Sequence, residues 1–449
     1  MDSQRGTGLR LISPLTATCI VVANMIGTGV FTSLGFQVTG LPSAFAIMVL
    51  WGTGGVCALC GALAYAELAS ALPRSGGEYH FLSQIYHPAV GFLAGWISAT
   101  VGFAAPVALA AMAFGTYLNG LFPGVAPLAL SVGVVVAVTL IHLGTLRLSS
   151  IFQDTATSLK IILIVVLIVL GFSLVGRSQA SFLPHTRDTG LITGNSFAVS
   201  LVYVMYAYSG WNACVYILGE MRDPARTAPI ALLVGTVFVT ALYMALNAMF
   251  LYVAPLTELA GRIDVGHVAA TRIFGVIGGD IMSGLIGLGL VSAVSAMTWI
   301  GPRVSMTMGE DCRALRFLAK RCPQGSPRVA LIVQSAIVIL LLLTSTFDAV
   351  LTYIQFSLTL MSFLAVLGVI VLRVRHPELP RPCRMWGYPF TALIFLGITA
   401  WMMWHILADR PMESLAGLAT LAVGLAVYFI SPTHPIAMSN QPNPNPKLT

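Results

Sequence analysis

Three short stretches of the chain carry residues that could bind a small charged molecule inside an otherwise apolar protein. They are MIGTGVF at residues 25–31, YSGWN at residues 208–212, and a lysine, Lys160, within TATSLKIILIVVLIVLG. Because a glycine costs about 1 kcal/mol in a helix interior relative to alanine, glycines within an apolar run predict an interrupted helix whose N–H and C=O groups are free to bind a ligand. For the GTG triplet alone, close helix packing is an equal alternative, since small residues let membrane helices approach one another.

The composition is that of a membrane protein with many spanning helices. The chain has 449 residues, of which 57% are hydrophobic and 9% are charged, whereas a soluble domain carries roughly 25% charged residues. Apolar stretches of about 20 residues, the length needed to cross a bilayer as a helix, recur along almost the whole sequence. We expect no separate soluble domain, and the first apolar run is too long for a removable signal peptide.

Polar residues, prolines and glycines divide the chain into twelve predicted spans. These lie at residues 12–36, 43–72, 89–119, 125–144, 151–175, 196–220, 228–254, 278–302, 329–346, 348–372, 389–408 and 413–431. With the N-terminus in the cytoplasm, seventeen of the 23 lysines and arginines fall in cytoplasmic segments and five outside, and Lys160 remains within a span. This bias predicts that both termini are cytoplasmic, and it accounts for the net charge of +7 without a nucleic-acid partner.

The two glycine-containing interruptions hold corresponding positions in the chain. They fall in the first and sixth predicted spans, which are five positions apart in the order of the spans. An odd number of spans per half gives the halves opposite orientations, which is typical of inverted-repeat transporters that bind substrate at the midplane between broken helices. The predicted organisation is a cytoplasmic N-terminus at 1–11, repeats at 12–175 and 196–372, two extra helices at 389–431, and a disordered cytoplasmic tail at 432–449.

Four motifs in order along the chain resemble a known family. They are MIGTGVF, AYAELASALPRSGGEYHFL at 64–82, YAYSGWNACVYILGEMRDPARTAPIAL at 206–232, and GPRVSMTMGEDCRAL at 301–315. Together they resemble the amino acid-polyamine-organocation superfamily, and within it the L-type amino acid transporter branch. The resemblance implies an all-α polytopic membrane protein with 12 transmembrane helices, a leucine-transporter-type 5+5 inverted repeat, broken helices one and six, and two extra C-terminal helices.

The resemblance also implies which residues bind the substrate. They are Ile26, Gly27, Thr28, Gly29, Tyr206, Ala207, Ser209, Gly210 and Asn212. The amides of the GTG triplet would hold the substrate carboxylate, since a helix N-terminus is a prepared anion site. Carbonyls at the half-helix ends, including that of Ile26, would hold the α-ammonium. Tyr206 and Trp211 are the expected gate, and for Asn212 a hydrogen bond between helices is an equal alternative.

Lys160 is the one lysine or arginine within a predicted span. Burying such a charge costs at least about 2.5 kcal/mol at the bilayer centre, so a function is the default hypothesis, and snorkelling from a helix end is the alternative. The resemblance implies that the ammonium takes the place of a coupling sodium ion. It would reach the first span near Gly27 and the eighth span, where Ser292 or Ser295 could accept, and it could carry a coupled proton.

The remaining polar residues give weaker signals. We expect Glu67, Glu78 and Glu220 to be structural partners of nearby arginines, which leaves no acid or base in the pocket and favours neutral amino acids. The eight histidines lack metal-ligand spacing and the chain has no phosphate-binding G-x-x-x-x-G-K, so we expect no enzyme activity, metal, cofactor or ATP-driven pumping.

These observations predict a sodium-independent secondary transporter of L-amino acids in the cytoplasmic membrane, working by alternating access as an exchanger or a proton-coupled symporter. One alternative is a carrier of polyamines or other organocations, which would need acidic residues facing the cavity at mid-depth. The other is a non-transporting amino acid sensor, which would need a signalling domain. Light subunits of the resembled branch bind a heavy subunit through a cysteine between spans three and four. Here LNGLFPGVAP at 118–127 has none, so we expect no disulfide-linked heavy subunit.

Overall fold

The computed structural model describes residues 12–143, 146–176, 180–320, 327–409 and 411–430, and within these ranges the elements are helices. The first half of the chain forms α1 (Pro14–Met25), α2 (Gly29–Gly40), α3 (Ala44–Ala71), α4 (Glu78–Ile85), α5 (Pro88–Ile97), the π-helical turn η1 (Ser98–Gly102), α6 (Ala104–Asn119), α7 (Pro127–Leu143) and α8 (Leu146–Leu174). The second half forms α9 (Thr186–Ile192), α10 (Asn195–Tyr208), the 3-10 helix η2 (Ala213–Glu220), α11 (Pro224–Val253), α12 (Leu256–Leu259), α13 (Val265–Asp311), η3 (Arg313–Ala319), α14 (Arg328–Thr344), α15 (Phe347–Arg375), α16 (Phe390–Asp409) and α17 (Pro411–Ile430).

The outer surface of this bundle is apolar. Within the described ranges, nine helical stretches are long and apolar enough to cross a membrane, and three shorter apolar helices accompany them. Large aliphatic side chains on these helices are more than half exposed, among them Ile162, Val169, Val234 and Leu340. Such positions are predominantly polar on the helices of a soluble protein. The exposed faces therefore contact lipid, and the chain is a multi-pass membrane protein.

Each of the twelve stretches predicted as a span is helical over most of its length, and the main differences lie at the ends. The predicted span at 278–302 falls within α13, which is 47 residues long and bends at Gly275, where φ is 76°. A left-handed φ of this kind favours glycine. The short helices α4, α9 and α12 were not predicted, because they have too few residues to give a periodic apolar pattern.

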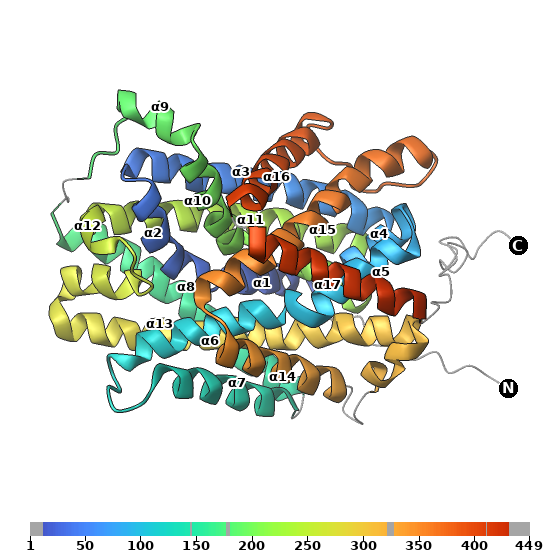
Figure 1. The fold of residues 1–449 in the computed structure, drawn as a ribbon, viewed down its shortest axis with the longest axis horizontal. Coiled ribbons are helices and arrows are strands. Elements are labelled where there is room, and N and C mark those ends of the chain that lie inside the picture. The colour runs from blue at the N-terminus through green and yellow to red at the C-terminus, as the bar shows by residue number, and fades with distance from the viewer. Residues whose placement is uncertain (1–11, 144–145, 177–179, 321–326, 410, 431–449) are drawn as a thin grey trace, which may run out of the picture.

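The broken helices lie in the middle of the bundle (Figure 1), where α1 packs against α11 and α2 packs against α10. Aromatic rings fill the space between them. The ring of Tyr243 on α11 lies 5.6 Å from that of Trp51 on α3 and 5.1 Å from that of Tyr208 on α10. These contacts connect α10 to α3 and α11, which pack against one another.

Candidate functional site

The first break separates α1 from α2 in the middle of the MIGTGVF stretch. Helix α1 ends at Met25 and α2 begins at Gly29, with Ile26 outside helical geometry at φ −75° and ψ 82°. The amide of Gly27 donates to the carbonyl of Met25 at 2.8 Å, so it does not pair with the carbonyl of Ala23 as it would in a continuous helix. The break therefore leaves carbonyls at the end of α1 and amides at the start of α2 without their helical partners.

Lys160 supplies donors to these carbonyls. Its ammonium donates to the carbonyl of Ala23 at 3.2 Å and to that of Ile26. The side chain is only 1% exposed, so it does not snorkel to the membrane surface. A positive charge from α8 thus takes the place of the amide donors that the break removes, and it is stabilised by the negative end of the α1 dipole.

Ser292 and Ser295 do not accept from this lysine in the structure. The hydroxyl of Ser292 lies 3.2 Å from that of Thr157 on α8, and the hydroxyl of Ser295 lies 2.9 Å from Nε2 of His142 on α7. The expectation that one of them accepts from Lys160 is therefore corrected. The physical reason is that buried backbone carbonyls without an amide partner must find a donor, and the break places two of them within reach of the ammonium.

The second break lies between α10 and η2, at the YSGWN stretch. Helix α10 ends at Tyr208, and Ser209 turns the chain into extended geometry with ψ 154°. Gly210 follows with φ 93°. A Cβ at Gly210 would also lie 2.8 Å from the backbone of Asn24 on α1. Both the backbone angle and the close approach to α1 require glycine at this position.

The two breaks touch at a second point, which lies at Gly29, the last residue of the GTG triplet. A Cβ added at Gly29 would lie 2.4 Å from Cα of Ala207, closer than any carbon contact between side chain and backbone. At Gly27 the nearest atoms would be 3.9 Å away, which is an ordinary contact. Gly29 therefore allows α2 to begin directly against the end of α10, whereas Gly27 has no such constraint.

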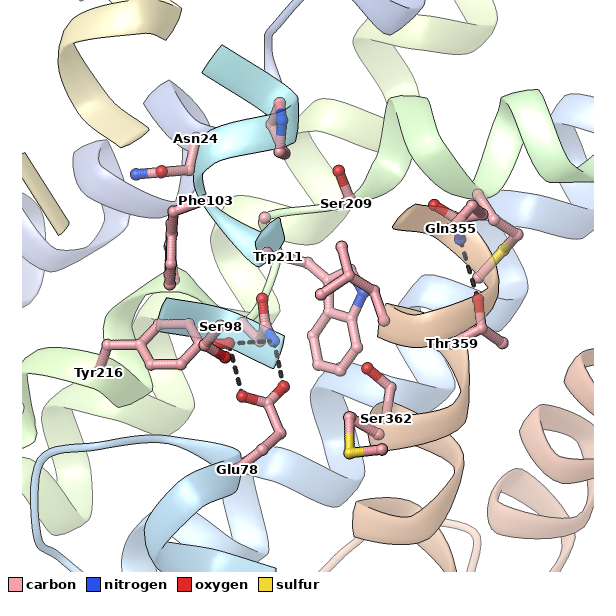
Figure 2. A pocket seen from close by; sticks show the side chains of 18 of the residues that line it. Asn24, Glu78, Ser98, Phe103, Ser209, Trp211, Tyr216, Gln355, Thr359 and Ser362 are labelled. Atoms are coloured by element: carbon pink, nitrogen blue, oxygen red, sulfur yellow. Dashed lines mark hydrogen bonds between the residues drawn. The ribbon is translucent and has the colours of Figure 1, made fainter. Parts of the chain in front are cut away.

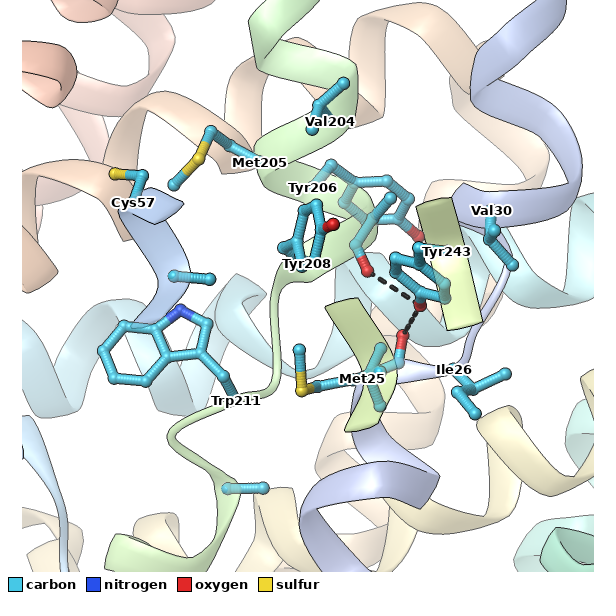
Figure 3. Close-up of a cluster of buried hydrophobic side chains, with 14 of the residues drawn as sticks. Met25, Ile26, Val30, Cys57, Val204, Met205, Tyr206, Tyr208, Trp211 and Tyr243 are labelled. Carbon is cyan, nitrogen blue, oxygen red and sulfur yellow. Dashed lines mark hydrogen bonds between the residues drawn. The ribbon is translucent and has the colours of Figure 1, made fainter. Parts of the chain in front are cut away.

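Tyr243 links the two breaks and was missed in the sequence. Its hydroxyl lies 2.5 Å from the carbonyl of Met25 and 3.1 Å from that of Ala207 (Figure 3). The tyrosine comes from α11, which continues without a break from Pro224 to Val253. A tyrosine in an apolar helix is also typical of packing, so the position of Tyr243 at the breaks could not be inferred from the pattern.

A small cavity lies where the two breaks meet. Its lining comprises Asn24, Met25, Gly27, Thr28, Gly29, Pro106, Ala110, Tyr206, Ala207, Ser209, Ala293 and Met297. It has a volume of about 20 Å³, which is room for roughly one water molecule. Most of the predicted binding residues therefore gather in one place, and Tyr206, 5% exposed, forms part of the wall. In this conformation the space at the breaks is too small for an amino acid.

A larger cavity of about 80 Å³ continues from the first one (Figure 2). Four residues line both cavities, namely Asn24, Pro106, Ser209 and Met297. Gly210, Trp211 and Asn212 line the larger cavity. The ring of Trp211 packs edge-on against Tyr65 of α3, with 4.7 Å between ring centroids. Ser209 thus lies at the junction of the cavities, and Trp211 and Asn212 lie beyond it.

Glu78 points into the larger cavity, so the expectation that it pairs with an arginine is wrong. Its carboxylate accepts from Tyr65 at 2.8 Å, from Asn212 at 2.6 Å and from Tyr216 at 2.5 Å. The cause is the turn before α4, where two successive glycines with positive φ return the chain to the bundle. Asn212 therefore makes a hydrogen bond between helices in this structure.

The other two carboxylates follow the expectation. Glu67 is 1% exposed and accepts from Arg373 at 2.9 and 2.6 Å. Arg381 lies 3.4 Å from the same carboxylate. Glu220 pairs with Arg303 at 3.2 Å. These ion pairs join segments that are distant in the sequence, and they lie outside both cavities.

Comparison with known proteins decides the family. The sequence profile of the family described as "Amino acid permease" matches residues 12–434. The chain belongs to the amino acid permease family. This permease is 24% identical over 425 residues to the b(0,+)-type amino acid transporter 1 of Mus musculus, covering 93% of the chain and 86% of the relative. It is 28% identical over 444 residues to the large neutral amino acids transporter small subunit 2 of Rattus norvegicus, covering 95% of the chain and 81% of the relative.

The permease is therefore a member of the amino acid-polyamine-organocation superfamily, as its four motifs predicted. Its relatives are amino acid transporters and not enzymes. Amino acid transport is the activity that the family supports. The two helix breaks at the centre of the bundle are therefore the candidate substrate site.

Proposed function

We propose that this permease is a sodium-independent secondary transporter that moves amino acids across the cytoplasmic membrane by alternating access, as an exchanger or a proton-coupled symporter. The observation that carries the proposal is the meeting of two broken helices around one cavity, with a buried ammonium at the first break. Broken helices of this kind present helix ends to substrate at the bilayer midplane.

The substrate carboxylate binds at the start of α2 in this proposal. The amides of Thr28 and Gly29 belong to the break and first turn, where a helix has no intrahelical partners for its N–H groups. The positive end of the helix dipole adds to their attraction for an anion. Gly27, Thr28 and Gly29 all line the small cavity, which supports this assignment.

The α-ammonium binds at the carbonyl ends of α1 and α10. The carbonyl of Ile26 already accepts from Lys160, that of Tyr206 accepts from the amide of Ser209 at 3.0 Å, and that of Ala207 accepts from Tyr243. Each carbonyl oxygen has two lone pairs, so each keeps one acceptor site for an ammonium N–H. Gly210 and Asn212 act by shaping the second break.

Sodium independence rests on Lys160. A sodium ion needs several oxygen ligands, and the break offers carbonyls of the kind that coordinate it in transporters with broken helices. Here the ammonium occupies two of these carbonyls and carries the same charge as sodium. Its burial leaves open a second role for the lysine, as the carrier of a coupled proton, while Ser292 and Ser295 fix the neighbouring face of α13 through Thr157 and His142.

The proposed architecture has twelve spans, two inverted five-span repeats at 12–175 and 196–372, and two further helices at 389–431. Two contacts support the repeat. Helix α3 packs along α11, and α6 packs along α13, so the second span meets the seventh and the third meets the eighth. The distribution of lysine and arginine supports cytoplasmic termini.

The size of the cavities supports the proposal of alternating access. Because the space at the breaks holds roughly one water molecule, substrate entry requires the half-helices to move. Tyr206 and Trp211 are the proposed gate, since one lines the small cavity and the other the large one. The loop at 118–127 lacks cysteine, so we propose that the carrier works without a disulfide-linked heavy subunit.

Neutral amino acids are the proposed substrates, because Pro106, Ala110, Ala293 and Met297 supply apolar walls around the breaks. The test is counterflow in proteoliposomes with the purified full chain, using labelled leucine against unlabelled neutral amino acids or putrescine. Exchange of neutral amino acids that persists when potassium replaces sodium supports the proposal. Exchange only of putrescine would favour the organocation carrier, and binding without any exchange would favour a sensor.

A further inference from the structure

The carboxylate of Glu78 is buried, and the described residues supply it with no countercharge. The side chain is 4% exposed, and it faces the larger cavity. Its three hydrogen-bond donors are the hydroxyls of Tyr65 and Tyr216 and the amide of Asn212, all of them neutral. Buried charges in proteins are usually paired or bound to a ligand of opposite charge.

Two basic side chains lie near Glu78 in the sequence. One forms an ion pair with another carboxylate, and the other is uncharged. Arg74 donates to both carboxylate oxygens of Asp311 at 3.0 Å. Burial and the nearby Arg74 lower the pKa of His80 to about 3, so this histidine is neutral at physiological pH. Among the described residues, no lysine, arginine or histidine forms an ion pair with Glu78.

Aromatic rings surround the carboxylate on the cavity side. The rings of Phe103 and Tyr216 lie edge to face with 5.3 Å between their centroids, and Trp211 packs against Tyr65. In Figure 2 the carboxylate of Glu78 points toward the space between Tyr216 and Trp211. Ring faces attract organic cations, so a carboxylate among them has the chemistry of a site for an ammonium or guanidinium group.

We propose that Glu78 and the rings of Phe103, Trp211 and Tyr216 form a subsite for the cationic end of an amino acid side chain. This inference rests on the proposed function, because the α-carboxylate and α-ammonium must bind at the helix breaks. The side chain then extends past Ser209, which lines both cavities. The substrate class is an amino acid with a side-chain ammonium or guanidinium, such as lysine or arginine.

The hydrogen bonds of Glu78 explain how one site serves two substrate classes. A carboxylate has about four lone-pair positions, and three of them are occupied here. The fourth is available to an N–H group of a cationic side chain. When a neutral amino acid is bound, the three neutral donors keep the carboxylate hydrogen-bonded, so neutral substrates are also accepted.

The test compares uptake of labelled lysine and labelled leucine into proteoliposomes by the wild-type protein, Glu78→Gln and Tyr216→Phe. We expect Glu78→Gln to lower the ratio of kcat/KM for lysine to kcat/KM for leucine by about tenfold or more, since hydrogen bonds to charged groups are the strong ones. Tyr216→Phe keeps the carboxylate and the ring and should keep the ratio. The matched control is Glu378→Gln, because the side chain of Glu378 is 71% exposed.

The outcomes separate this inference from the proposed function. A selective loss of lysine transport in Glu78→Gln supports the subsite. Equal losses of lysine and leucine transport in both Glu78→Gln and Tyr216→Phe would overturn the subsite. They would show that the carboxylate only joins η2 to α3 and α4. Leucine exchange by a wild-type protein that neither transports lysine nor is inhibited by it would also overturn it. If neither amino acid is exchanged, the proposed function fails as well.

Discussion

Gly29→Ala is predicted to disable the permease by separating the two helix breaks. The added Cβ would lie 2.4 Å from Cα and 2.6 Å from Cβ of Ala207, whereas carbon atoms pack at about 3.5–4.0 Å. Because the obstacle is backbone, α2 and α10 must move apart by about 1 Å. Overpacking of this kind costs about 1–3 kcal/mol. At 1.4 kcal/mol per factor of ten, this lowers the equilibrium population of the wild-type arrangement of the breaks by roughly 5- to 150-fold.

The loss should appear in transport, because the shift also draws the carbonyl of Ala207 away from Tyr243. The assay is leucine counterflow in proteoliposomes, with size-exclusion chromatography of the purified variant as the check on folding. Gly133→Ala is the matched control, since a Cβ there meets no atom within 4 Å. Gly27→Ala, with 3.9 Å of clearance, should retain more activity than Gly29→Ala. A folded Gly29→Ala protein with more than half of wild-type exchange would refute the reasoning.

Three further predictions concern two groups at the breaks and one buried ion pair away from them. Lys160→Ala should lower exchange by about 10- to 100-fold, because charge-assisted hydrogen bonds contribute about 1.5–3 kcal/mol; unchanged kinetics would contradict the assignment. Tyr243→Phe removes a hydroxyl worth about 0.5–1.5 kcal/mol and should lower kcat/KM roughly 2- to 10-fold with little change in the Tm of the detergent-solubilised protein. Glu67→Gln should lower that Tm and the yield, since breaking a buried ion pair costs about 3–5 kcal/mol, while the ratio of lysine to leucine uptake stays at the wild-type value.

The helices and both breaks could be predicted because their signals are local. Hydropathy over about 20 residues locates a span, and a glycine in the middle of such a run marks an interruption. Lys160 was identifiable for a similar reason, since a charge within an apolar stretch needs a partner wherever it lies. The sequence did not reveal that this partner is the pair of carbonyls at Ala23 and Ile26.

The contacts that were missed depend on tertiary structure. Glu78 follows a turn in which Gly76 and Gly77 have φ 118° and 54°, and this turn directs its carboxylate toward Asn212 and Tyr216 instead of an arginine. Tyr243 shows no local signal, because its role comes from the crossing of α11 over both breaks. Ser292 and Ser295 lie on the expected helix, but their hydroxyls bind Thr157 and His142.

The central claim is that the two breaks recognise the α-carboxylate and α-ammonium of an amino acid without sodium. It is tested most directly by competition in sodium-free leucine counterflow, using leucine, its decarboxylated amine isopentylamine and N-acetyl-leucine as unlabelled competitors. We predict that leucine competes and that neither analogue does, because each lacks one of the groups that the helix ends bind. Competition by isopentylamine equal to that by leucine, or the absence of any exchange until sodium is added, would contradict the claim.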